Sequence, residues 1–151
     1  MRSGPEPFDA PDVAALCAAQ QVEMHELYGE ADIGPSRDAR MFEPPDGVFV
    51  VVRDEAGTAV ACGGVARFDA TCGELKRMFV VPGARGRGLG RVLLEELERH
   101  ARQLGYVSLV LETGDRQAAA LALYGRAGYV RRPCWPPYDS RALSVCFEKR
   151  L

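Results

Sequence analysis

The chain has 151 residues, a formal net charge of −2 and a sequence pI near 5.7. This length fits one domain of ordinary size, so we expect a single domain over residues 1–151. The slightly acidic balance gives no general footprint for nucleic acid, and no apolar run approaches the roughly 18–20 residues of a membrane span. The first residues lack the apolar stretch of a signal peptide. We therefore expect a soluble, cytoplasmic protein without a nucleic-acid or membrane partner, and we leave a homodimer open.

The five cysteines are scattered along the chain and odd in number. They form no C-x-x-C pair, and the short spacing from Cys62 to Cys72 has no histidine nearby to complete a zinc site. We expect no bound metal, and we expect reduced thiols that are mostly buried.

The first predicted element in chain order is a helix. A capping-type residue and Pro11 mark its start, and apolar residues recur with mostly helical spacing up to Tyr28. Before it, Pro5 and Pro7 interrupt the chain, so a leading strand is expected to be short or absent. Residues 29–46 are rich in glycine, proline and charge, which predicts a loop with room for a short helix.

The middle of the chain changes to a strand pattern. β-Branched and aromatic residues fill 48–52, a hairpin turn at 54–57 leads into 58–68, and a second turn at 69–73 leads into 74–81. The later elements are a helix over 88–104, a strand over 108–112, a helix over 117–127, a strand from 129 and a last strand over 143–149. This order predicts an α/β domain with a strand–loop–helix–strand crossover, and ligands commonly bind at the helix N-terminus of such a crossover.

The loop Arg85-Gly86-Arg87-Gly88-Leu89-Gly90 occupies that crossover and is followed by Arg91. Glycines let backbone N–H groups turn toward an anion, and the helix dipole and guanidinium groups add to the attraction. The alternative is an ordinary turn with solvated arginines. A mononucleotide P-loop would need Ser or Thr after Gly-Lys, and a dinucleotide fold would need a different glycine spacing near the start of the chain.

Several linked segments resemble the GNAT superfamily of N-acetyltransferases. Val80-Val81-Pro82 and the glycine–arginine loop are similar to its R/Q-x-x-G-x-G/A signature. The similarity continues through 109–113 and Gln117 to 122–129, and covers 47–131 well. The resemblance implies a mixed, mostly antiparallel central sheet of six to seven strands with a splayed central pair, flanked by about four helices.

The resemblance also implies acetyl-CoA as co-substrate. In this family the backbone of the strand before the loop pairs with pantetheine, and the loop amides hold the pyrophosphate. Gln117 stands where many members have asparagine. The implied cofactor-binding residues are Met78, Phe79, Val80, Arg85, Gly86, Arg87, Gly88, Leu89, Gly90, Arg91, Gln117 and Tyr124.

Acetyl transfer needs a neutral amine, a polarised thioester and a proton for the departing thiolate. Tyr124 matches the family tyrosine that supplies this proton, although the same side chain would also suit a core. Two residues are candidates for the base, and Glu74 is favoured, either as the base or as a carboxylate that binds the amine. Glu74 is expected on the face of Lys76, Met78 and Val80, while Glu112 ends the next strand. Each glutamate would alternatively serve as an ion-pair partner.

The acceptor side is less constrained by the sequence. Arg37, Arg40 and Arg77 are candidates for binding an acceptor carboxylate, with a solvated surface as the alternative. The segment 133–138 is stiff and aromatic, and it is either a substrate wall or a packed crossing loop. Both histidines are expected to be structural. The aromatic residues expected to line the acceptor side are Tyr28, Phe42, Trp135 and Tyr138.

These features favour an N-acetyltransferase that acts on a small primary amine, such as an amino acid, a polyamine or an amine-bearing antibiotic. Protein N-terminal or lysine acetylation is the alternative on the same fold. A non-catalytic acyl-CoA-binding module is the alternative from another class.

Overall fold

The protein is described by a computed structural model over residues 1–29 and 39–151. Its strands are β1 (Arg2–Pro5), β2 (Val48–Arg53), β3 (Ala59–Arg67), β4 (Cys72–Val80), β5 (Ser108–Gly114), β6 (Val130–Arg132) and β7 (Ser144–Arg150). The described α-helices are α1 (Pro11–Tyr28), α2 (Leu89–Gln103) and α3 (Ala118–Arg126). Short 3-10 helices are η1 (Ala39–Phe42), η2 (Pro82–Ala84) and η3 (Tyr138–Ser140). The expected α/β fold is confirmed, with three α-helices among the described residues.

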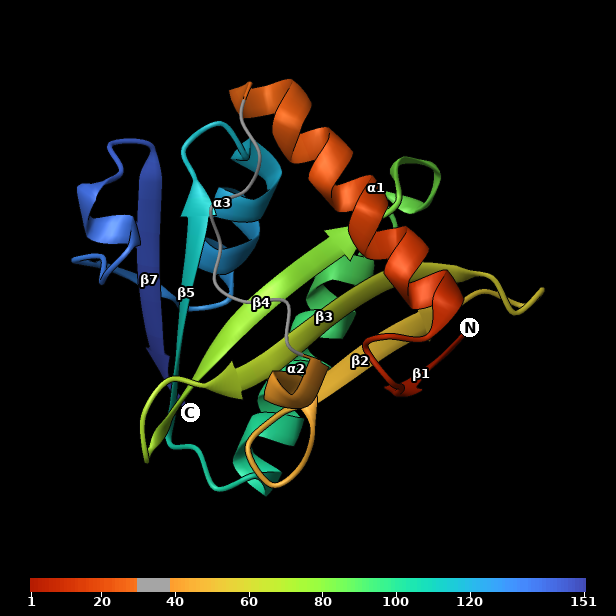
Figure 1. Cartoon of the computed structure of the whole chain (residues 1–151), viewed down its shortest axis with the longest axis horizontal. Coiled ribbons are helices and arrows are strands. Elements are labelled where there is room, and N and C mark those ends of the chain that lie inside the picture. The colour runs from red at the N-terminus through yellow and green to blue at the C-terminus, as the bar shows by residue number, and fades with distance from the viewer. Residues whose placement is uncertain (30–38) are drawn as a thin grey trace.

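All strands join one seven-stranded sheet in the order β1-β2-β3-β4-β5-β7-β6. Every neighbouring pair is antiparallel except β4 and β5. The parallel pairing joins Cys72–Leu75 to Ser108–Leu111 and then stops. Beyond it, β4 stays paired with β3 as far as Val80, whereas β5 stays paired with β7 as far as Gly114. The sheet therefore opens between its two central strands, as Figure 1 shows.

The local sequence explains why the elements around this opening form. Every residue from Val48 to Val52 is buried, which matches a central strand covered on both faces. Helix α1 has a proline in its first turn, and it ends at Gly29, whose φ of 72° lets its N–H reach the carbonyl of His25. The leading strand is present as β1, which pairs with β2 although Pro5 is its last residue. Edge strands tolerate proline, so this short strand completes a sheet of seven.

Two hydrophobic clusters lie on opposite faces of the sheet. One cluster includes Leu93, Leu97 and Leu109, and it lies on the face covered by α2 and α3. The other includes Val13, Leu16, Phe42 of η1 and Phe49 of β2, and it lies under α1 (Figure 1). The central strands thus have a helix layer on each side, and α1 crosses the sheet on the face opposite α2.

A β-bulge inside β4 corrects one expectation from the sequence. Cys62 of β3 pairs with Phe79 and Gly64 pairs with Lys76, so β4 has one residue more than β3 across this stretch. Arg77 lies at the bulge with a φ of 61°, the only positive φ among the described non-glycine residues. The extra residue inverts the alternation of side chains. Leu75 packs in the α2 cluster and Phe79 in the α1 cluster, so Glu74 shares a face with Lys76 but not with Met78 and Val80.

The cysteines give a second correction. Cys134 and Cys146 form a disulfide with their Cα atoms 5.2 Å apart, which contradicts the expectation that all thiols are reduced. The loop after β6 turns back onto β7 and brings the two residues together, and this turn was not visible in their spacing. Cys17, Cys62 and Cys72 take part in no disulfide. In the part of the chain that the structure describes, no helix is both long and apolar enough to cross a membrane.

Candidate active site

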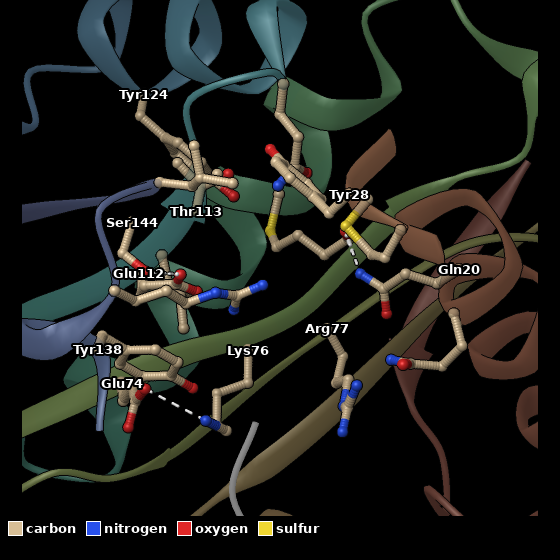
Figure 2. A pocket seen from close by; sticks show the side chains of 18 residues that line it. Gln20, Tyr28, Glu74, Lys76, Arg77, Glu112, Thr113, Tyr124, Tyr138 and Ser144 are labelled. Carbon is tan, nitrogen blue, oxygen red and sulfur yellow. Dashed lines mark hydrogen bonds and ion pairs between the residues drawn. The ribbon is translucent and has the colours of Figure 1, made fainter. Parts of the chain in front are cut away.

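A cavity of about 110 Å³ lies where β4 and β5 separate. Helix α1, the two strands, α3 and the segment between η3 and β7 all contribute to its walls (Figure 2). It brings together Glu74, Arg77, Met78, Glu112, Gln117, Tyr124, Tyr28 and Tyr138 of the predicted site residues. The sequence did not single out its other lining residues, which include Gln20, Met24, Thr113, Gly114, Arg141, Leu143 and Ser144.

Tyr124 occupies the α3 wall and is buried, with 6% of its surface exposed. Its ring packs against Tyr129 and Phe147 at centroid distances of 5.8 and 6.0 Å. Burial raises the pKa of its phenol above the ordinary value, and the nearby negative charge of Glu112 raises it further. The phenol therefore carries its proton at neutral pH, as a general acid must. The core role and the catalytic role considered for Tyr124 are compatible in this geometry.

Glu112 lies on β5 beside this tyrosine. The side chain of Ser144 at the start of β7 donates a hydrogen bond to its carboxylate at 2.7 Å. Figure 2 shows Tyr124, Thr113, Ser144 and Glu112 grouped on one side of the cavity. The strand pairing of β5 with β7 fixes this group, because Glu112 stands opposite Cys146 and Gly114 opposite Ser144.

Glu74 lies nearer the start of β4 than the other cavity residues of that strand, next to Tyr138 in Figure 2. Its carboxylate forms an ion pair with the ammonium of Lys76 at 3.2 Å, and the two side chains are only 13% and 8% exposed. The predicted alternative of an ion-pair role is therefore present for Glu74, with Lys76 rather than an arginine as its partner. An ion pair withdrawn from water in this way is costly to disrupt by removing one member.

The glycine–arginine loop lies outside the cavity lining, at the start of α2. Gly86 and Gly88 adopt φ values of 79° and 77°, and an added Cβ at either position would meet nothing within 4 Å. No side chain caps the first turn of α2. An open backbone cradle at an uncapped helix N-terminus fits a phosphate group. Gly90 lies close enough to Leu123 that an added Cβ would be 3.2 Å from it, so the loop is packed directly against α3.

Arg85 departs from the simple picture of a phosphate clamp. Its guanidinium donates to the carbonyl of Val80 at 2.9 Å and to Glu23 of α1 at 2.6 Å, and it lies 5.6 Å from the centroid of the Phe79 ring. This side chain ties α1 to the end of β4. Arg91 is paired with Glu95 one turn along α2, at 3.0 Å.

Gln20 lines the cavity, although the sequence did not single it out as a site residue. Its amide donates to the backbone carbonyl of Met78 at 3.0 Å, on the edge of β4 where β5 has moved away. Its Oε1 is buried and has no hydrogen-bond partner. A buried acceptor beside an open strand edge fits a ligand that offers an N–H group, as the amides of pantetheine do. The sequence places Gln20 in the first helix, but it does not show that this part of the helix packs against β4.

The C-terminal end of α1 closes another wall. The Tyr28 ring lies directly on Gly114, where an added Cβ would be 1.8 Å from the tyrosine oxygen. The backbone N–H of Arg116 donates to that oxygen at 3.1 Å, and its guanidinium donates to the carbonyl of Leu27 at 2.7 Å. Gly114 therefore has to be a glycine for α1 to reach β5.

The other predicted acceptor-side residues are divided. Arg77 and Tyr138 line the cavity, whereas Phe42 is buried in the α1 cluster and Arg40 lies in η1 outside the lining. Arg37 lies outside the described residues. Trp135 packs edge-on against both Phe68 and Tyr138, with centroids 5.1 and 6.0 Å away. The 133–138 segment is thus a packed loop that also presents Tyr138 to the cavity.

Comparison with known proteins places these features in a family. The model of the acetyltransferase (GNAT) family matches residues 13–129. The IAA acetyltransferase of Azospirillum brasilense is 44% identical over 115 residues, which cover 76% of this chain and 74% of that protein. A crystal structure of a candidate acyl-CoA N-acyltransferase from Klebsiella pneumoniae is 35% identical and has a TM-score of 0.86, covering 99% of this chain and 97% of the other.

More distant structures share the fold alone. The PaiA N-acetyltransferase of Thermoplasma acidophilum, solved in complex with coenzyme A, has a TM-score of 0.74 at 15% identity, with both chains fully covered. The family match spans most of the chain, and the splayed strands, the glycine loop and the buried tyrosine agree with it. This chain belongs to the acetyltransferase (GNAT) family and is an acyltransferase.

Proposed function

We propose that this enzyme transfers the acetyl group of acetyl-CoA to the primary amine of a small molecule by direct attack. The observation that carries the proposal is the meeting of Tyr124 and Glu112 in one cavity between splayed strands. The uncapped N-terminus of α2 packs against α3, the helix that carries Tyr124, since an added Cβ at Gly90 would lie 3.2 Å from Leu123.

The donor side would be held mainly by backbone. The amides of residues 86–91 would bind the pyrophosphate, and the free edge of β4 at Met78, Phe79 and Val80 would pair with pantetheine. Gln117, which lines the cavity at the start of α3, would contact the same arm. When bound, acetyl-CoA supplies an acetyl thioester at the mouth of the cavity. Family membership and the coenzyme A complex of the Thermoplasma relative support this assignment.

Tyr124 would hold the proton that the departing sulfur needs. Its raised pKa keeps the hydroxyl protonated at neutral pH, so it can donate a hydrogen bond, and then the proton, to the sulfur as negative charge develops there. The buried position also excludes water from the point where the proton moves.

Glu112 is our proposed base, and Glu74 is the alternative. Glu112 lies close enough to Tyr124 to influence its titration, and Ser144 orients its carboxylate. Glu74 is already paired with Lys76, so taking a proton would disrupt a largely buried ion pair. We expect Glu112→Gln to lower kcat about tenfold or more, because general-base catalysis contributes at least that much. The matched variant Glu74→Gln should lower kcat less, and the reverse order in steady-state kinetics would transfer the role to Glu74.

The size of the cavity is compatible with a small acceptor. A volume of about 110 Å³ suits a single side-chain-sized group. Acetylation of a protein N-terminus or lysine remains the second candidate on the same fold, since a terminal residue alone would also fit.

The test is an acetylation screen read by mass spectrometry. The purified protein is incubated with acetyl-CoA and separate panels of amino acids, polyamines, aminoglycosides and short peptides. We expect acetylated product from a small-molecule panel at a rate that Tyr124→Phe reduces strongly. Binding of acetyl-CoA without product from any panel would contradict the proposal and indicate a binding module.

A further inference from the structure

The segment 133–143 connects β6 to β7 and forms one wall of the cavity. It contributes Tyr138, Arg141 and Leu143 to the lining, and Ser144 follows at the start of β7. Within this segment only Tyr138 is buried, and the other residues are exposed or half-buried. A segment that buries so little of itself has little local stability, so its position depends on what attaches it to the sheet.

Several backbone hydrogen bonds of this segment close within it. The N–H of Tyr138 donates to the carbonyl of Trp135 at 2.7 Å, and the N–H of Arg141 donates to that of Tyr138 at 3.1 Å. At its end, the carbonyl of Leu143 accepts from the N–H of Asp115, at 2.9 Å. The segment is therefore a small folded unit, and the disulfide adds a covalent attachment to the sheet.

The disulfide attaches this unit beside the proposed base. Cys146 of β7 stands opposite Glu112 of β5, and opposite residues of an antiparallel pair point to the same face of the sheet. Ser144, two residues earlier on that face, donates to the Glu112 carboxylate at 2.7 Å. The covalent attachment therefore lies on the face of the sheet that carries the cavity.

The two ends of this bond differ in their access to solvent. Cys146 is 1% exposed, whereas Cys134 is half-buried in the connecting segment. A dithiol reductant attacks the Cys134 sulfur, displaces the Cys146 thiolate, which takes up a proton, and then closes its own disulfide. The protein gains two electrons and two protons as two thiols, and the dithiol is oxidised to a disulfide. A disulfide oxidant reverses the exchange.

We propose that the Cys134–Cys146 disulfide is a redox switch for the acceptor side of the cavity. In the oxidised enzyme the bond fixes the segment 133–143 against β7, with Tyr138 in the cavity wall. In the reduced enzyme the covalent attachment is gone, and the segment leaves β7 and opens that wall. The control of acceptor binding rests on the proposed function, whereas the release of the segment does not.

Trp135 reports this release, because it is the only tryptophan of the chain and follows Cys134 directly. In the oxidised protein its ring packs against Phe68 and Tyr138. We expect dithiothreitol to shift its emission to longer wavelength as the ring enters water, and oxidised glutathione to restore the emission. Trypsin should cleave after Arg141 about tenfold faster or more in the reduced protein, because cleavage follows the population of the open segment.

Two variants link these changes to the disulfide. Cys134→Ser cannot form the bond, so its emission and its cleavage by trypsin should match those of the reduced wild type. Neither should respond to dithiothreitol. Cys72→Ser, at a cysteine that takes part in no disulfide, is the matched control and should respond as the wild type does.

Steady-state kinetics tests the effect on the acceptor, with the amine that gives the highest rate in the acetylation screen. Reduction should raise its KM about fivefold or more, because binding must then order the segment again. The Kd of acetyl-CoA by calorimetry should stay within about twofold, because the proposed acetyl-CoA site shares no residue with the segment.

The outcomes separate the switch from the proposed function. Identical emission and cleavage in the oxidised and reduced protein would overturn the switch, whatever the enzyme acetylates. A released segment with an unchanged KM, or a response of Cys134→Ser to dithiothreitol, would also overturn it. No turnover of any amine with acetyl-CoA bound would overturn the proposed function, while emission and cleavage would still decide whether the disulfide holds the segment.

Discussion

In the proposed function, the loop before α2 presents backbone groups to acetyl-CoA, whereas the cavity between β4 and β5 presents side chains to the acceptor. Gly86 and Gly88 form an open cradle with no side-chain cap, and the expected contacts there are N–H groups. The cavity instead collects tyrosines, carboxylates and arginines from five separate parts of the chain. A backbone site binds what all members of a family share, and a side-chain site can change its acceptor without altering the fold. In the proposed function, the loop would therefore determine the donor, and the side chains at the strand opening would determine the acceptor.

The largest expected effect tests the glycine loop that is proposed to bind the pyrophosphate. Gly88→Asp should weaken acetyl-CoA binding by more than about 100-fold, because it adds a negative charge to the anion cradle and a Cβ at a φ of 77°. Calorimetry measures the Kd. Gly57→Asp is the matched control, since Gly57 has a φ of 85° in the remote β2–β3 turn and an equally open surrounding. Similar losses in both variants would indicate a folding defect rather than a phosphate site.

The next effect tests the general-acid role proposed for Tyr124. Tyr124→Phe should lower kcat about 100-fold or more while the Kd of acetyl-CoA stays within about twofold, since only the hydroxyl group is removed. Tyr129→Phe is the control, because Tyr129 is also buried and packs on Tyr124, but its hydroxyl donates to Glu98. Unchanged turnover in Tyr124→Phe would remove the general-acid role.

A third experiment perturbs only the acceptor side of the cavity. The Cys134–Cys146 disulfide fixes the loop that carries Trp135 and Tyr138 against β7. Cys134→Ser should lower the free energy of unfolding by about 2–4 kcal/mol and raise the KM of the acceptor, with the Kd of acetyl-CoA unchanged. Urea unfolding and steady-state kinetics provide both values. Cys72→Ser, at a free cysteine, controls for loss of a thiol. A change in acetyl-CoA binding would show that the proposed acetyl-CoA site and the acceptor side of the cavity are not independent.

The smallest expected effect is the alkaline dependence of stability. Burial raises the pKa of both Tyr124 and Tyr129 above their ordinary value of 10.0. The folded state thus holds these protons more tightly than the unfolded chain, so their contribution is complete below about pH 10 and is lost as the pH rises through the folded values. We expect the free energy of unfolding to decrease above about pH 10, and less steeply in Tyr129→Phe. Parallel urea titrations of the two proteins check this, and identical slopes would contradict it.

The sequence predicted most of the elements that form the proposed donor site. Its glycines, the strand before them and the helix after them are local features, and local features survive in a one-dimensional pattern. The same holds for the strand and helix order, including the crossover between β4 and β5. The tyrosine and both glutamates could also be named, because each stands at a fixed offset from a recognisable element.

The remainder depends on contacts between distant segments. The bulge at Arg77 follows from the register of β3 against β4, and one extra residue was enough to reverse the expected face of Met78 and Val80. Gln20 reaches Met78 across 58 positions of sequence. The disulfide required knowledge of how the loop after β6 folds back. The arginines at positions 40 and 77 were alike in sequence, and of these two described residues only Arg77 lines the cavity.

The strained backbone at Arg77 has a consequence for engineering this enzyme. An L-residue in the left-handed region costs roughly 1–2 kcal/mol relative to glycine. Selection of random variants for heat resistance should therefore recover glycine or asparagine at this position, with a higher Tm. If Arg77 binds the acceptor, those same clones will have lost discrimination between acceptors. Thermostability and substrate choice would then be in direct conflict at a single backbone angle.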